Sequence, residues 1–79
     1  MLLEEFNAMD KMPIIELKLN GEWDYFDIHF KHDGTMWCYT NESNVTMIVD
    51  EDLSLDENLQ AFYSLLIEHL INNGYEIGE

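Results

Sequence analysis

The chain lacks arginine and contains only three lysines, Lys11, Lys18 and Lys31, against seventeen acidic residues, so its formal net charge is −14. From position 32 to the end of the sequence there is no Lys or Arg at all. Because phosphate groups are neutralised by Lys and Arg side chains, this scarcity argues against direct binding of nucleic acid. Self-repulsion among so many carboxylates costs folding free energy, so we expect the charge to serve a purpose.

Cysteine and long apolar runs are also scarce. The single Cys38 cannot form an internal disulfide, which is usual in a reducing compartment. No apolar run approaches the roughly 18 residues that a membrane span needs. The first residues, "MLLEEFNAMDK", carry acids where a signal peptide needs cations. We therefore expect a cytoplasmic protein, in the host cytoplasm if a phage encodes it, with no membrane association.

What the chain does contain is material for a core. Hydrophobic residues make up 47% of its 79 positions and aromatic residues 13%, which is too rich for a disordered acidic tail. There are no repeats and no linker, and Pro13 is the only proline, so residues 1–79 are expected to form one small domain. In the N-terminal segment 1–10, Leu2, Phe6 and Met9 have helical spacing, which indicates a short helix.

Two glycine dipeptides predict turns in the sheet of residues 13–49. Asn20-Gly21 is typical of a two-residue type I′ hairpin, which pairs Ile15 with Phe26. This register puts an apolar set on the core face and leaves Trp23 and Tyr25 on the opposite face. The core-face set is Ile15, Leu17, Leu19, Phe26, Ile28 and Phe30.

Asp33-Gly34 is interpreted as a second two-residue turn. It pairs Phe30 with Trp37 and Ile28 with Tyr39 on the core face. The residues then assigned to the opposite face are His29, Lys31, Met36 and Cys38. "VTMIV" supplies a fourth strand, whose inward residues are Val45, Met47 and Val49.

A helix over residues 55–73 completes the expected fold. Ser54 and Glu57 fit the Ser-x-x-Glu capping box, and Asn73-Gly74 is a typical helix end. The apolar stripe between them consists of Leu55, Leu59, Phe62, Leu66 and Leu70, flanked by Tyr63 and Ile67. The prediction is an α+β domain, an antiparallel β-meander of three to four strands with the C-terminal helix packed on one face.

Metal and catalytic sites are not expected. A calcium loop starting at Asp50 would lack the glycine at its sixth position and the glutamate at its twelfth. His29, His32 and Cys38 lack the paired spacing of structural zinc ligands. A Cys38–His29 nucleophile and base would have no glycine-rich oxyanion loop beside it. We therefore expect no cofactor, no metal and no enzymatic activity.

The outer face of the sheet leaves two readings open. Trp23 and Tyr25, with Ile14, Met36 and Ile48, are either covered by the N-terminal segment or exposed as an apolar patch. Exposed aromatic residues inside an acidic rim are typical anchors for a protein partner.

The size of the charge favours one function. A domain of this length is about 30 Å across, and duplex DNA of that length carries roughly 18 phosphate charges. A net charge of −14 is comparable. The hypothesis is an acidic nucleic-acid mimic, an inhibitor that occupies the DNA- or RNA-binding surface of another protein. In size, charge and class the chain resembles the small acidic proteins of phages and mobile elements, such as anti-CRISPR and anti-restriction proteins and uracil-glycosylase inhibitors. The resemblance carries over no functional residue.

The expected partner is a basic nucleic-acid-binding protein, such as a Cas effector or a restriction enzyme. Trp23 and Tyr25 are the candidate short-range anchors. The carboxylates expected to supply the field are Asp33, Glu42, Asp50, Glu51, Asp52, Asp56 and Glu57. The alternatives are an immunity protein or antitoxin that neutralises a cationic nuclease toxin, and an acidic adaptor that docks through its aromatic face. A homodimer is left open.

Overall fold

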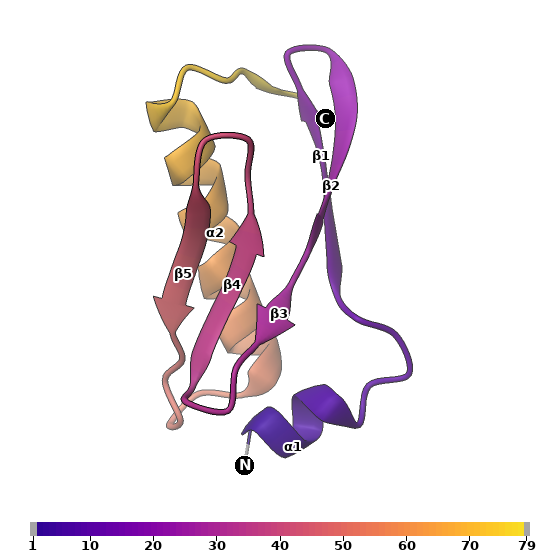
Figure 1. Ribbon diagram of the computed structural model, residues 1–79, viewed down its shortest axis with the longest axis vertical. Coiled ribbons are helices and arrows are strands. Elements are labelled where there is room, and N and C mark those ends of the chain that lie inside the picture. The colour runs from indigo at the N-terminus through magenta and orange to yellow at the C-terminus, as the bar shows by residue number, and fades with distance from the viewer. Residues whose placement is uncertain (1, 79) are drawn as a thin grey trace.

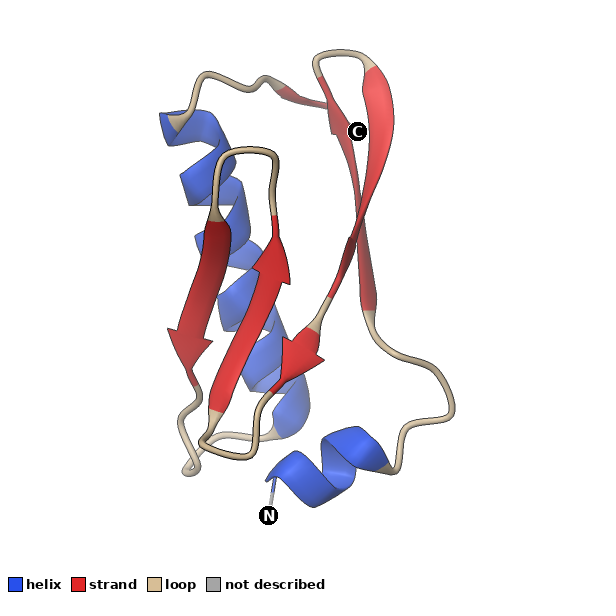
Figure 2. Ribbon diagram, in the orientation of Figure 1, coloured by secondary structure: helices blue, strands red, loops and turns tan. Residues whose placement is uncertain are grey.

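The computed structural model of the chain describes residues 2–78, which form two three-stranded antiparallel sheets and two helices (Figures 1 and 2). The strand orders are β2-β1-β6 and β3-β4-β5. The elements are α1 (Leu2–Asn7), β1 (Ile14–Leu19), β2 (Glu22–Asp27), β3 (His29–Phe30), β4 (Thr35–Tyr39), β5 (Asn44–Ile48), α2 (Leu55–Asn72) and β6 (Ile77–Gly78). The predicted α+β class is confirmed. No helix in this part of the chain is long and apolar enough to span a membrane.

The first hairpin has the predicted register. Asn20 and Gly21 both have positive φ, as a type I′ turn requires, and Ile15 pairs with Phe26. Phe26 is therefore buried, whereas Trp23 and Tyr25 are 56% and 60% exposed.

The second hairpin is one residue longer in its loop than predicted. The backbone N–H of Lys31 donates to the carbonyl of Thr35 at 2.8 Å, and Gly34 has a φ of 90°. Such a three-residue loop is a type I turn followed by a left-handed residue that forms a bulge. Asp33 supports it, because its carboxylate accepts the N–H of Thr35 at 3.0 Å.

This extra loop residue exchanges the two faces of β4. His29 pairs with Trp37, one position away from the predicted register, and a one-residue shift moves every side chain to the other face. Met36 and Cys38 are fully buried. The predicted core positions of Trp37 and Tyr39 are therefore wrong, as are the predicted outer positions of Met36 and Cys38.

The strand expected over residues 22–30 is divided at Ile28. The backbone N–H of Ile28 donates to the carbonyl of Pro13 at 3.0 Å, and its side chain is fully buried. β2 therefore pairs with β1, while β3 pairs with β4, and the expected meander becomes two sheets that diverge toward the upper end (Figure 1). β6, which the sequence did not predict, extends the first sheet by pairing Lys18 with Gly78.

α2 lies behind β4 and β5 (Figure 1), and its N-terminal cap is the predicted one. Ser54 Oγ accepts the N–H of Glu57 at 3.1 Å, and the Glu57 carboxylate accepts the N–H of Ser54 at 3.2 Å. The buried face of the helix carries Phe62, Leu66 and Leu70 together with one polar residue, Asn58.

α1 covers the lower end of the core. Leu2 and Phe6 are buried, and the Phe6 ring packs on that of Phe30 with centroids 5.3 Å apart. The N-terminal segment therefore leaves Trp23 and Tyr25 uncovered. Of the two alternatives for the outer face, the exposed one is correct for both residues.

Candidate functional site

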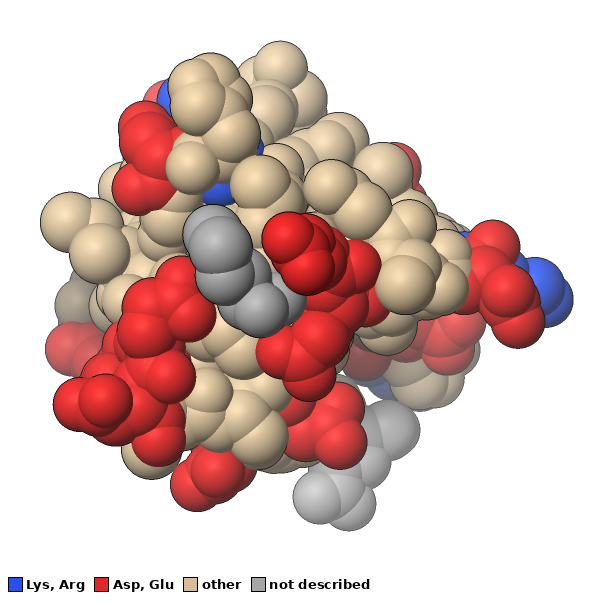
Figure 3. Space-filling model, turned by 90° about the horizontal axis from the view of Figure 1, so that it is seen from below, with Lys and Arg blue, Asp and Glu red and all other residues tan. Residues whose placement is uncertain are grey.

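Acidic residues gather at the lower end of the molecule, where the β3–β4 loop, the β5–α2 loop, the first turn of α2 and α1 meet (Figures 1 and 3). The two loops are joined by a hydrogen bond from the N–H of Val49 to the carbonyl of Gly34, at 3.0 Å. α1 packs against α2 beside them. We call this surface the acidic pole and define it by Glu4, Glu5, Asp33, Asp50, Glu51, Asp52, Asp56 and Glu57.

The carboxylates of the acidic pole are exposed and have no cationic partner. Within residues 2–78, no carboxylate lies within 4.0 Å of a lysine or histidine nitrogen. Every carboxylate in this range is exposed except that of Asp24, which is half-buried. Hydrogen bonds from Thr35 lower the pKa of Asp33 below its usual value, with a smaller contribution from Lys31. The pole therefore presents charge that no ion pair within residues 2–78 neutralises.

Asn58 fixes the loop that carries much of this charge. Its side chain accepts the N–H of Asp50 at 2.8 Å and donates to the carbonyls of Asp50 and Ser54, both at 2.9 Å. The Asp50 carboxylate in turn accepts the N–H of Asp52 at 2.9 Å. Because Asn58 is buried and its three bonds are partly buried, they tie the start of this loop to the first turn of α2.

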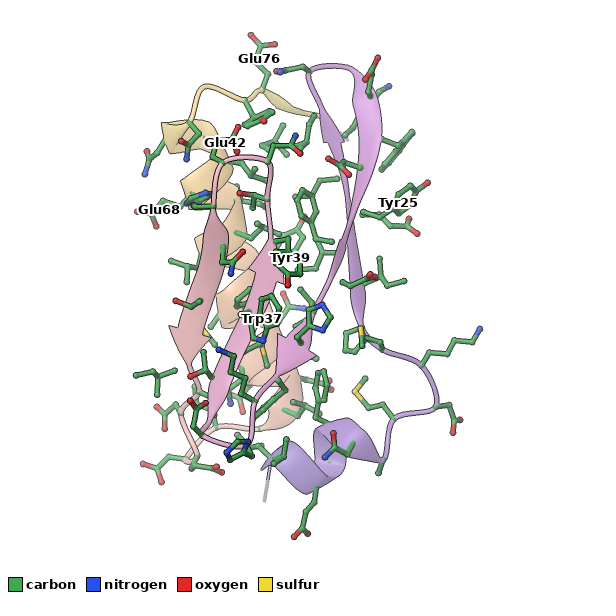
Figure 4. The ribbon with its side chains drawn as sticks, viewed as in Figure 1. Tyr25, Trp37, Tyr39, Glu42, Glu68 and Glu76 are labelled. Atoms are coloured by element: carbon green, nitrogen blue, oxygen red, sulfur yellow. The ribbon has the colours of Figure 1, made fainter. Side chains whose placement is uncertain are left out.

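The structure brings most of the predicted charged residues together, but not Glu42. Glu42 lies in the β4–β5 turn toward the opposite end, where its carboxylate accepts the hydroxyl of Tyr75 at 2.6 Å (Figure 4). Glu4 and Glu5, which the sequence analysis did not include, belong to the acidic pole instead. The sequence shows that both acids belong to the predicted N-terminal helix. It does not show where this helix packs, and its position beside α2 places the two acids in the pole.

A second exposed feature is a strip of aromatic rings on the outer face of the β3-β4-β5 sheet. His29 stacks on Trp37 with centroids 4.5 Å apart, and Tyr39 meets the edge of Trp37 at 4.7 Å. The Lys31 ammonium lies 5.6 Å from the Trp37 ring centroid. Tyr39 is 64% exposed. We call His29, Trp37 and Tyr39 the aromatic strip.

Trp23 and Tyr25, the predicted anchors, belong to the other sheet. Figure 4 shows Tyr25 on β2 pointing away from Trp37 and Tyr39. The outer surface therefore presents two aromatic areas. The aromatic strip was not predicted, because the expected register placed Trp37 and Tyr39 on the core face.

Cys38 does not form a reactive pair with His29. The thiol is on the core face, and burial raises its pKa to about 11, whereas His29 stacks on Trp37 on the outer face. A thiol with a raised pKa is a poor nucleophile near neutral pH. Within residues 2–78, no group of three or more His, Cys, Asp or Glu side chains converges to hold a metal ion.

The fold is thus a small α+β domain whose distinguishing surface is an unpaired acidic pole. No protein-family model matches the sequence, and neither a curated protein nor a solved structure is significantly similar to it.

Proposed function

We propose that this protein is a nucleic-acid mimic, an inhibitor that occupies the cationic DNA- or RNA-binding surface of another protein. The observation that carries the proposal is the acidic pole, whose carboxylates are exposed and form no ion pair within residues 2–78. Three of them, those of Asp50, Glu51 and Asp52, are on the β5–α2 loop, which Asn58 ties to α2. Charges that are already in position and have no partner of their own are available to a cationic surface without the loss of an internal ion pair.

The magnitude of the charge supports the proposal. The longest principal axis of the molecule is 37 Å. Duplex DNA of that length carries about 22 phosphates, at one charge per ~1.7 Å. The net charge of −14 is roughly two-thirds of that number. A groove that attracts DNA therefore attracts this domain with a field of the same order, and that field accelerates association.

The partner class follows from the charge. It is a basic nucleic-acid-binding protein, for example a Cas effector or a restriction enzyme. An immunity protein that neutralises a cationic nuclease toxin would use the same acidic pole, and it differs in being encoded beside its toxin. No catalytic activity is proposed for this chain.

One observation favours a second candidate, an acidic adaptor that docks through aromatic residues. Tyr39, Tyr25 and Trp23 are each more than half exposed, and such rings are frequent interface anchors. Salt distinguishes the two candidates. Association driven by charge slows steeply as ionic strength rises, whereas aromatic docking changes little.

The test is association kinetics with a partner captured from the native host. We expect the triple variant Asp50→Lys, Glu51→Lys and Asp52→Lys to associate about tenfold or more slowly at low salt. The matched control reverses three exposed acids outside the acidic pole, at Glu16, Glu22 and Glu68, and changes the net charge equally. A triple variant that associates no more slowly than this control would remove the acidic pole from the interface.

A further inference from the structure

A groove opens between the two sheets at their upper end, away from the acidic pole. Its volume is about 190 Å³, far more than the roughly 15 Å³ that one water molecule requires. Its apolar base is formed by the buried side chains of Leu19, Phe26 and Leu70. Tyr39 and Tyr75 line it as well. The groove lies where the two sheets diverge, because the chain passes at Ile28 from β2 in the first sheet to β3 in the second.

Among residues 2–78, Asp24 is the one charged side chain that lines this groove. It alternates with Trp23 and Tyr25 along β2 and therefore shares the inward face with Phe26. One carboxylate oxygen, Oδ1, accepts the N–H of Tyr25 at 2.8 Å. No residue in the described range donates to the other oxygen, Oδ2. Asp24 is also the only described carboxylate that is half-buried, so its charge has lost part of its hydration without gaining a cation.

Neither Lys18 nor Lys31 faces the groove. Lys18 pairs with Trp23 on the outer face of the first sheet, and Lys31 lies over Trp37. A second carboxylate lies close by, since Tyr75, which lines the groove, donates its hydroxyl to Glu42. The groove thus combines an apolar base, aromatic walls and negative charge.

We propose that this groove is a binding site for an arginine side chain of the basic partner. The aliphatic stem lies along Leu19 and Phe26, and the guanidinium group donates to Asp24 Oδ2. Arginine fits better than lysine because its planar group is less strongly hydrated, stacks on a tyrosine ring and donates two N–H groups in a fixed geometry. This inference rests on the proposed function, because the same basic partner supplies the arginine.

The test needs no partner protein. The ¹⁵N-labelled full chain is titrated with N-acetyl-arginine amide and followed by two-dimensional NMR. The lysine and citrulline amides serve as comparison probes, and citrulline is the neutral analogue of arginine. We expect saturable shifts at the amides of Asp24, Tyr39 and Tyr75, with a Kd on the order of millimolar, weaker binding of the lysine probe, and no saturable binding of citrulline.

Two matched variants identify the carboxylate. Asp24→Asn keeps the shape and an oxygen for the Tyr25 N–H but removes the charge, and we expect it to weaken arginine binding about tenfold or more. Asp27→Asn makes the same change on the exposed face of the same strand and should bind as the natural sequence does. Equal binding of citrulline, equal binding of lysine, undiminished binding by Asp24→Asn, or shifts centred on the acidic pole would each overturn the proposal. None of these results alters the charge-reversal test, so the two proposals fail separately.

Discussion

Asn58 holds both backbone polar groups of Asp50, accepting its N–H at 2.8 Å and donating to its carbonyl at 2.9 Å. One buried amide side chain thus ties the first turn of α2 to the start of the β5–α2 loop, which carries Asp50, Glu51 and Asp52 and is called the acidic loop below. It occupies a position on the otherwise apolar face of the helix, which carries Phe62, Leu66 and Leu70 further along. Asn58 therefore packs in the core and also bonds the backbone of a residue of the acidic pole.

Asn58→Ala is expected to lower the free energy of unfolding by about 2–4 kcal/mol. The substitution removes three hydrogen bonds and leaves the polar groups of Asp50 without partners in a partly buried setting. Urea denaturation measures the change. Gln60→Ala, on the exposed face of the same helix, is the control and should change stability by less than about 0.5 kcal/mol. If the two variants are equally stable, the Asn58 bonds do not hold the loop.

The faces of β4 are tested by a pair of neighbouring residues. Met36 is fully buried and Trp37 lies on the outer face. Met36→Ala should therefore cost about 2–5 kcal/mol of stability through lost burial and a cavity. Trp37→Ala loses the ring contacts with His29, Tyr39 and Lys31 on the outer face and should cost about 1–2 kcal/mol. Thermal or urea unfolding measures both losses of stability. A larger loss for Trp37→Ala than for Met36→Ala would favour the register with a two-residue turn.

The buried thiol of Cys38 predicts a loss of stability at alkaline pH. Burial raises its pKa from 9.0 to about 11, so the unfolded chain releases this proton before the folded one. The stability that depends on Cys38 is complete below pH 9 and falls as pH rises toward 11, by up to about 2 kcal/mol. Unfolding measured between pH 8 and pH 11 should show a steeper fall for the natural sequence than for Cys38→Ala. Parallel curves would contradict the burial of the thiol.

The two hairpins show why one register could be predicted and the other could not. Asn20-Gly21 supplies two residues that accept positive φ, which specifies a two-residue turn. Asp33-Gly34 fits a two-residue turn and equally a three-residue loop with Gly34 left-handed, and these differ by one position. The strand "TMWCY" has apolar or aromatic residues on both of its faces, so its pattern could not decide between the two registers.

Features that depend on contacts between distant segments could not be predicted from local sequence patterns. The break at Ile28 depends on the carbonyl of Pro13, and the alternation of apolar residues continues through it. The acidic loop and helix cap could be located from local signals at Ser54 and Glu57. The separation of Glu42 from the acidic pole, and the groove beside Asp24, depend on how the two sheets diverge, which no local pattern specifies.

We propose that the acidic pole competes with nucleic acid for one site on the partner. The most direct measurement is the affinity of the captured partner for a labelled duplex at increasing concentrations of this protein. We expect the apparent Kd for the duplex to rise linearly with the protein concentration, without a plateau, and no ternary complex to form. A partner that keeps its affinity for the duplex while this protein is bound would contradict it.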